Sequence, residues 1–273
     1  MKKILVPTDY SECANNAVSV AKKIAARSGA ELYFLHLEEV TPEVVHVLHH
    51  EKHAHDSHLG QARYQLQEVV NLAEKEGLKA HQIFIPSSQG EDIDSYIKPY
   101  DIDLVVMGSH GAKGIKEAFI GSNTQSVIRH AHVPVLVIKH PEENFNPGRI
   151  VFASSFRNNI RKQLKIVMNF ARLWNAEVDL VFINLLSHLI DEHEAEKLMR
   201  IQMKEAGVSG CTLSVIETNE EEFGIMEFAE SVNADVIAVV LDVRTGLGWF
   251  FNSSTAEKLA NHSQTPVFVI NPE

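Results

Sequence analysis

Short apolar runs alternate with longer amphipathic stretches along the first half of the chain. The runs are residues 3–9, 30–37, 81–86, 103–108 and 133–139. Such runs are typical of strands that are buried on both faces of a parallel sheet. After the first run, "SECANNAVSVAKKIAARSGA" places its apolar residues on one stripe of a helix, with Ser11 as the predicted N-cap and Gly29 as the predicted stop. The alternation predicts an α/β fold, a parallel sheet with helices on both faces.

The same pattern starts again after residue 148. Three pairs of segments match in order: 149–156 with 3–10, 176–184 with 30–38, and 235–270 with 103–138. The sequence therefore predicts two copies of one α/β domain, residues 1–140 and 149–273. Residues 141–148 are polar apart from one phenylalanine and carry two prolines, so they are predicted to be a linker.

Charge and composition narrow the classes of partner. The 273 residues hold 25 Lys and Arg against 36 Asp and Glu, a formal charge of −11. An acidic chain without a basic block repels nucleic acid, so we expect none as a partner. The two cysteines form no metal or redox motif, which favours a reducing cytoplasm. No apolar run approaches the roughly 20 residues of a membrane helix, so we expect no membrane partner and a cytoplasmic location.

The segment "VVMGSHG" leaves a predicted strand at its carboxyl end, where ligands bind in open parallel sheets. Gly108 and Gly111 would let the backbone turn and approach a ligand. Gly121 and Ser122 precede a predicted helix, whose first amides favour an anion. Local spacing alone leaves two interpretations open, a phosphate site and a glycine-rich turn.

A resemblance favours the first interpretation. "GSHGAKGIKEAFIGS" (108–122) fits the nucleotide-binding pattern of the universal stress protein family: Gly, two residues, Gly, nine residues, Gly-Ser. "KKILVPTDYSECANNAV" and "FLHLEE" are similar to the first strand and helix and to the second strand end of that family. The chain thus resembles a tandem member. The resemblance implies two Rossmann-like (adenine nucleotide alpha hydrolase-like) domains, each a five-stranded parallel sheet of order 3-2-1-4-5. It also implies a stress-response or signalling role and ATP binding, with Mg²⁺ as a companion.

Carried over by position, the resemblance implies that the nucleotide is bound by Pro7, Thr8, Asp9, Leu37, Met107, Gly108, Gly111, Gly121, Ser122 and Asn123. Asp9 would accept hydrogen bonds from the ribose hydroxyls, and the backbone of Leu37 would contact adenine. A cap on the first helix region is the alternative for Asp9. No activated nucleophile or general base is visible, so no catalytic residue is assigned. Two alternatives to a nucleotide-binding module remain, a slow ATPase and an interaction protein without nucleotide.

The second copy lacks the pattern. In place of Pro7, Asp9, Gly108, Gly111 and Gly121 it carries Ala153, Ser155, Val240, Val243 and Ser253. Valine resists positive φ and blocks a close backbone approach. We therefore expect a scaffold role for this domain. The apolar loop "GLGWFFNSS" (246–254) predicts packing against a neighbouring domain or subunit, or else a pocket for another ligand.

Six histidines fall within "HVLHHEKHAHDSH" (46–58), in a stretch that is shorter in the second copy. On a helix, His46 with His50 and His49 with His53 lie one turn apart, as two imidazoles on one zinc ion would. We expect a metal site at His46 and His50 as one interpretation. A solvated polar helix face and a pH-dependent interface are the alternatives.

The last predicted strand of each copy is an apolar edge. Members of the family often dimerise through this strand, and here "VPVLVIK" and "TPVFVIN" belong to one chain. Mutual pairing would cover both edges. We therefore expect an intramolecular pseudo-dimer of the two domains, which a further homodimer could extend.

Overall fold

The computed structural model describes residues 1–40, 58–87, 92–110, 120–241 and 253–271. The first half consists of β1 (Lys3–Pro7), α1 (Glu12–Ser28), β2 (Glu31–Glu39), α3 (His58–Lys75), β3 (Ala80–Ser87), η1 (Ile93–Tyr96), β4 (Leu104–Gly108), α4 (Ser122–His130) and β5 (Val135–Ile138). The second half consists of β6 (Arg149–Ser154), α5 (Arg161–Trp174), β7 (Glu177–Leu185), η2 (Leu186–His188), α6 (Glu192–Ala206), β8 (Thr212–Thr218), α7 (Glu221–Ser231), β9 (Val236–Val240), α8 (Ser253–His262) and β10 (Val267–Ile270). The predicted α/β alternation is confirmed in both halves.

Helix α1 begins and ends where the sequence predicts. The Ser11 hydroxyl accepts a hydrogen bond from the Ala14 amide at 3.2 Å, which satisfies one of the free amides of the first turn. Gly29 follows the last turn with φ of 72°, a left-handed conformation that glycine adopts without steric cost. Both capping predictions are confirmed.

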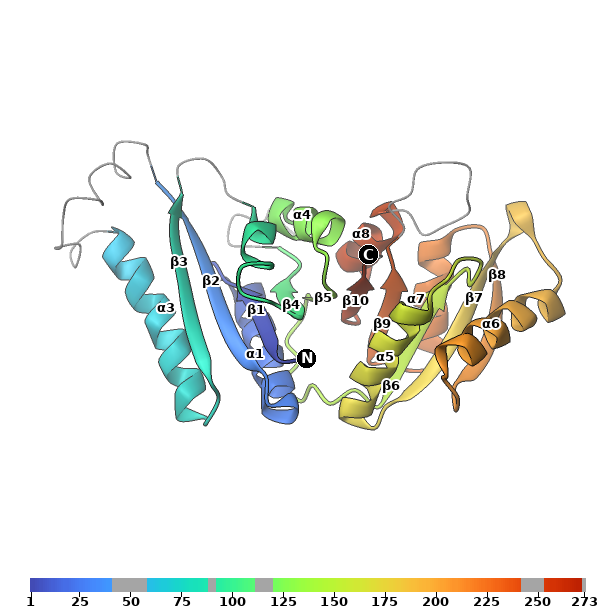
Figure 1. The fold of residues 1–273 in the computed structure, drawn as a ribbon. Helices are drawn as coiled ribbons and strands as arrows, with labels where there is room; N and C mark the ends of the chain where they lie inside the picture. Colours follow the sequence, from blue (N-terminus) through green and yellow to red (C-terminus); the bar gives the residue numbers. More distant parts are fainter. Residues whose placement is uncertain (41–57, 88–91, 111–119, 242–252, 272–273) are drawn as a thin grey trace.

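The ten strands of the described residues form a single sheet, in the order β3-β2-β1-β4-β5-β10-β9-β6-β7-β8. Each half has the order 3-2-1-4-5 and is parallel throughout, as the resemblance implied. The halves meet in the middle, where β5 and β10 pair antiparallel with Leu136 opposite Phe268 (Figure 1). This pairing covers the two apolar edges, and β3 and β8 are left at the outer ends.

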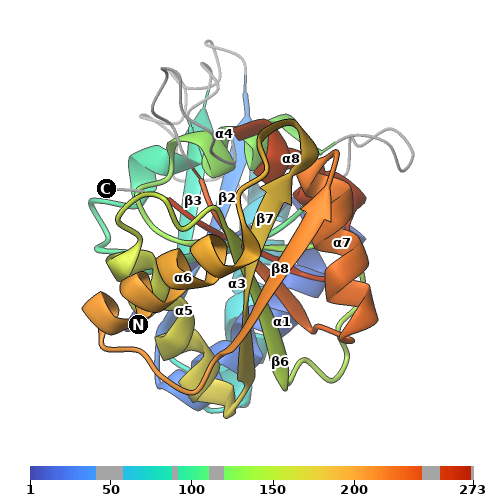
Figure 2. The same ribbon diagram turned by 90° about the vertical axis from the view of Figure 1, so that its right-hand side faces the viewer.

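Helices cover both faces of the sheet. One buried cluster joins the sheet to α1, α3, α5 and α6, and the other joins it to η1, α4, α7 and α8. Figure 2 looks at the β8 edge and shows α5 and α6 on one side of the sheet with α7 on the other. Both clusters draw residues from both halves, so the hydrophobic core is continuous along the chain.

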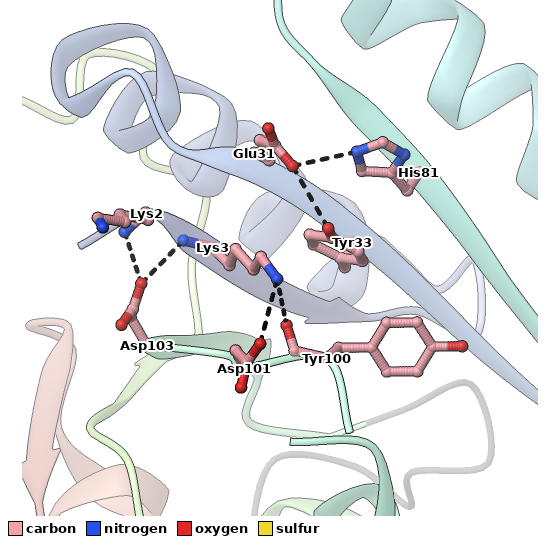
Figure 3. Close-up of polar contacts among 8 residues, drawn as sticks. All are labelled: Lys2, Lys3, Glu31, Tyr33, His81, Tyr100, Asp101 and Asp103. Carbon is pink, nitrogen blue, oxygen red and sulfur yellow. Dashed lines mark hydrogen bonds and ion pairs between the residues drawn. The ribbon is translucent and has the colours of Figure 1, made fainter. Parts of the chain in front are cut away.

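Hydrogen bonds at the strand starts repeat between the halves. The carboxylate of Asp103 accepts from the amides of Lys2 and Lys3 at 2.6 and 3.0 Å (Figure 3). Asp235 accepts in the same way from Gly148 and Arg149 at 2.8 and 2.9 Å. Because the aligned residues make the same contacts, the duplication extends from the sequence to individual hydrogen bonds.

The connecting segment 141–148 is packed against the core. Phe145 is only 5% exposed and lies edge-on against Trp174, with ring centroids 5.3 Å apart. The Arg27 guanidinium stacks on the Trp174 ring. It also donates hydrogen bonds to the carbonyl of Leu173 and to the side chain of Asn146, both at 3.0 Å. A polar pattern predicted a linker, but its one aromatic residue anchors the segment.

Candidate functional site

A cavity of about 600 Å³ opens at the carboxyl ends of β1, β2 and β4. Nine of the ten residues that the resemblance implies line it: Pro7, Thr8, Asp9, Leu37, Met107, Gly108, Gly121, Ser122 and Asn123. The tenth, Gly111, lies outside the residues that the structure describes. Four separate segments of the chain therefore meet around one cavity, at the edge of the sheet where doubly wound folds bind ligands.

The end of β1 forms a tight turn into α1. The Thr8 amide donates to the carbonyl of Leu35 at 2.8 Å, and the Thr8 hydroxyl accepts from the Tyr10 amide at 3.1 Å. Tyr10 has φ of 65°, which places Asp9 at the apex of the turn. The Asp9 carboxylate accepts from the Ser11 amide at 3.1 Å. Asp9 thus supports the turn, whereas the N-cap of the helix is Ser11.

The start of α4 also borders the cavity. Gly121 is the N-cap residue, has no side chain to satisfy the first amides, and donates its own amide to Ser109 at 2.9 Å. The amides of Ser122 and Asn123 belong to the first turn, which has no acceptors within the helix. Thr124 donates to the carbonyl of Gly108 at 2.8 Å and ties α4 to β4. This helix start supplies neutral donors and a positive dipole end for an anion.

Gly108 has a structural explanation that the sequence did not reveal. A Cβ atom added there would lie 2.9 Å from both the carbonyl carbon and the sulfur of Cys13 in α1. The missing side chain therefore makes room for a helix of the same chain, whereas the sequence suggested room for a ligand. Gly108 still lines the cavity through its backbone.

Several lining residues were not predicted from the motif. They are Ala14, Leu35, His36, Glu38, Glu39, Ile93, His110 and Thr124. The residues of β2 among them could have been inferred, since the carboxyl end of that strand borders the same edge of the sheet. His36 is a hydrogen-bonded core residue of this strand, with 6% exposure and two polar contacts.

A series of polar contacts connects the cavity lining at Thr8 and His36 to α3. Nδ1 of His36 lies 2.7 Å from the Thr8 carbonyl, and Nε2 lies 2.7 Å from the Glu38 carboxylate. The other oxygen of Glu38 lies 3.1 Å from Nδ1 of His58, the first residue of α3. Tyr10 stacks on the His36 ring at 4.6 Å. Burial, and secondly the Glu38 charge, raise the pKa of the Tyr10 phenol, which therefore stays protonated at neutral pH.

A much smaller cavity lies at the ends of β6 and β7 in the second half. A cavity of about 20 Å³ lies there, lined by Ser155, Ile183 and Asn184 among others. Val240 is the residue of the second half that aligns with Gly108. Val243 and the aromatic residues of 246–252 lie outside the described residues. A space of this size has room for about one water molecule.

A metal site and the absence of a membrane-spanning helix are two further expectations from the sequence. His46, His49, His50 and His53 lie outside it, so the zinc prediction stays a prediction. Within residues 1–40, 58–87, 92–110, 120–241 and 253–271, no three His, Cys, Asp or Glu side chains are grouped to hold a metal ion. No helix in these ranges has the length and apolar character to cross a membrane.

A doubly wound α/β fold with a cavity at the carboxyl ends of its strands is typical of Rossmann-like proteins that bind ligands. The model of the universal stress protein family matches residues 1–139 and 174–271, and the chain belongs to that family. It is similar to universal stress protein MJ0531 of Methanocaldococcus jannaschii, at 32% identity over 52% of this chain and 84% of the relative. Universal stress protein MJ0577 of the same organism is 28% identical over a region that covers 50% of this chain and 94% of the length of that relative. A universal stress protein from Archaeoglobus fulgidus shares the fold over 98% of both chains, with a TM-score of 0.75 and 23% identity.

Proposed function

We propose that the N-terminal domain, residues 1–140, binds one adenine nucleotide, with ATP as the preferred ligand. Residues 149–273 form a scaffold domain in this proposal. In this role the chain is an ATP-binding stress-response or signalling module. The observation that carries it is the cavity of about 600 Å³ at the ends of β1, β2 and β4, which gathers nine of the implied nucleotide-binding residues. A volume of this size lies in the usual range for small-molecule sites.

The lining residues divide into three groups that suit the three parts of a nucleotide. Apolar side chains of Leu37, Ile93 and Met107 suit the faces of a base. The Asp9 carboxylate at the apex of its turn suits the two ribose hydroxyls. The start of α4 at Gly121 to Asn123 suits the phosphates. Mg²⁺ would be held chiefly by the phosphates themselves, which is its usual mode.

The charge of the described lining favours neutral donors as the phosphate ligands. Its carboxylates are Asp9, Glu38 and Glu39, and its ionisable bases are His36 and His110. Backbone amides and hydroxyl groups at the start of α4 bind an anion by direction and dipole, and they do so in a chain of formal charge −11.

Nucleotide content and affinity test the proposal. Purified protein is denatured and the released nucleotide identified by mass spectrometry, and ATP binding is then measured by calorimetry. We expect one ATP per chain. We expect Asp9→Ala to weaken binding about tenfold or more, because a charge-assisted hydrogen bond is lost. Gly111→Val, which copies the second domain at Val243, should abolish binding with the fold intact.

Ser155→Ala is the matched control, since Ser155 stands in the place of Asp9 in the second half. It should leave the ATP affinity unchanged. Two equivalent sites per chain, or equal affinities in wild type and Asp9→Ala, would contradict the proposal.

A further inference from the structure

His36 is a buried imidazole with both ring nitrogens in polar contact. Its exposure is 6%, and the carbonyl of Thr8 and the carboxylate of Glu38 each lie 2.7 Å from one nitrogen. A carbonyl oxygen only accepts, so Nδ1 carries a proton and donates it to Thr8. Glu38 holds the other side of the ring, so the ring plane is set by two contacts at opposite corners.

The Thr8 carbonyl belongs to the turn that presents Asp9 and is the backbone group that His36 contacts. The Thr8 amide already bonds to Leu35 and its hydroxyl to the Tyr10 amide. The hydrogen bond from His36 fixes the peptide plane between Thr8 and Asp9. The orientation of this peptide plane sets the direction in which the Asp9 side chain leaves the backbone.

Other groups around the ring hold it in place. Tyr10 stacks on one side and donates its hydroxyl to the carbonyl of Ala62 in α3 at 2.6 Å. Phe84 of β3 lies on the ring at 5.8 Å, with the Arg63 guanidinium over the phenyl face at 5.3 Å. His58 contacts the second oxygen of Glu38 at 3.1 Å.

The second half of the chain contains the same turn with different side chains at the positions of Tyr10 and His36. There the aligned residues are Phe156 and Phe182, which stack with centroids 6.5 Å apart. Phe156 keeps a positive φ of 51°, and its amide still donates to the hydroxyl of Ser154 at 3.2 Å. An apolar pair therefore supports the same turn. The polar pair of Tyr10 and His36 occurs in the half that has the large cavity and Asp9.

We propose that His36 is a positioning residue for ribose recognition. It acts through the Thr8 carbonyl to aim the Asp9 carboxylate at the two ribose hydroxyls, and Tyr10 and Glu38 orient its ring. The site thereby discriminates ribonucleotides from nucleotides without these hydroxyls. This inference rests on the proposed function, because it requires a nucleotide in the cavity.

The test measures the ratio of the affinities for ATP and 2′,3′-dideoxy-ATP. Wild-type protein should bind ATP about tenfold or more tightly, and Asp9→Ala should bring the ratio near one. The double variant Tyr10→Phe/His36→Phe copies the pair found in the second half. We expect it to lower the ratio to about three or less, through a loss of affinity for ATP.

A matched control uses a second tyrosine–histidine pair on the same strands. Tyr33 and His81 lie at the other end of β2 and β3, with centroids 4.7 Å apart, beside Glu31 (Figure 3). Tyr33→Phe/His81→Phe makes the same chemical change away from the cavity and should leave the ratio unchanged. His36→Asn is a further variant, because its amide nitrogen can replace Nδ1 as the donor to Thr8. It should keep the ratio within about twofold of wild type.

The inference is overturned if Tyr10→Phe/His36→Phe keeps the wild-type ratio. It is also overturned if that variant loses affinity for both ligands equally, which would mark a purely structural role, or if His36→Asn loses the ratio. A wild-type protein that binds no nucleotide, or whose ratio does not depend on Asp9, would instead contradict the proposed function.

Discussion

At the scale of single residues, Gly108 decides how closely β4 and α1 approach. The space where its Cβ would lie is occupied by backbone atoms of Cys13, the sulfur of which contacts the carbonyl of Ile138 at 3.2 Å. The same contact brings the start of α1 to the edge of the cavity, where Ala14 is part of the lining. One residue without a side chain thus links the packing of the core to the shape of the site.

Gly108→Ala should lower the free energy of unfolding by about 1–3 kcal/mol, because a methyl group there overpacks against backbone that cannot move aside cheaply. Chemical denaturation measures the loss. Gly148→Ala is the control, since a Cβ at that position meets only the Asp235 carboxylate at 3.7 Å. Equal stabilities for the two variants would show that α1 shifts without cost.

At the scale of secondary-structure elements, α4 connects the cavity to the second half of the chain. Its first residues line the cavity, and its later residues contact α8. Glu257 of α8 is only 8% exposed and accepts hydrogen bonds from both Arg129 and Gln125. The two helices lie next to each other near the middle of the sheet (Figure 1).

Glu257→Gln should lower the free energy of unfolding by about 1–3 kcal/mol, since a buried hydrogen-bonded carboxylate is replaced by a neutral amide. The control is Glu196→Gln, which breaks the exposed pair with Arg200 at 3.1 Å in α6. That surface pair contributes about 0.5 kcal/mol or less. Urea unfolding of both variants measures the difference, and a smaller effect at Glu257 than at Glu196 would refute the expectation.

At the scale of the whole molecule, pairing of β5 with β10 makes one ten-stranded sheet from two five-stranded ones. The residues of β5 are nearly inaccessible to solvent, with Val135, Leu136 and Ile138 at 0%. An unpaired strand of this kind is an apolar edge that associates with another strand. We propose on this basis that the chain is a pseudo-twofold unit, equivalent to a dimer of two single-domain chains.

A fragment of residues 1–140 should therefore form a homodimer through β5, which size-exclusion chromatography with light scattering detects. Val137→Lys in the same fragment places a charge on this edge and should give a monomer. A wild-type fragment that stays monomeric at micromolar concentration would argue against the edge-strand explanation.

Features that depend on neighbouring residues could be predicted from the amino-acid sequence. The apolar runs predicted the strands, and Ser11 and Gly29 predicted the ends of α1, because capping and strand burial act over a few residues. The duplication was also readable, since aligned residues such as Asp103 and Asp235 keep their contacts. The resemblance supplied the strand order and the residues expected around the cavity.

Contacts between residues far apart in the chain depend on tertiary packing and are seen only in the structure. The contact between His36 and the Thr8 carbonyl, the burial of Phe145, and Cys13 as the neighbour of Gly108 each join segments far apart in the chain. The sequence pattern around each of these residues is compatible with other surroundings: a core histidine, a polar linker, a flexible turn. Their roles follow from packing between elements, whose geometry local propensity and periodicity do not encode.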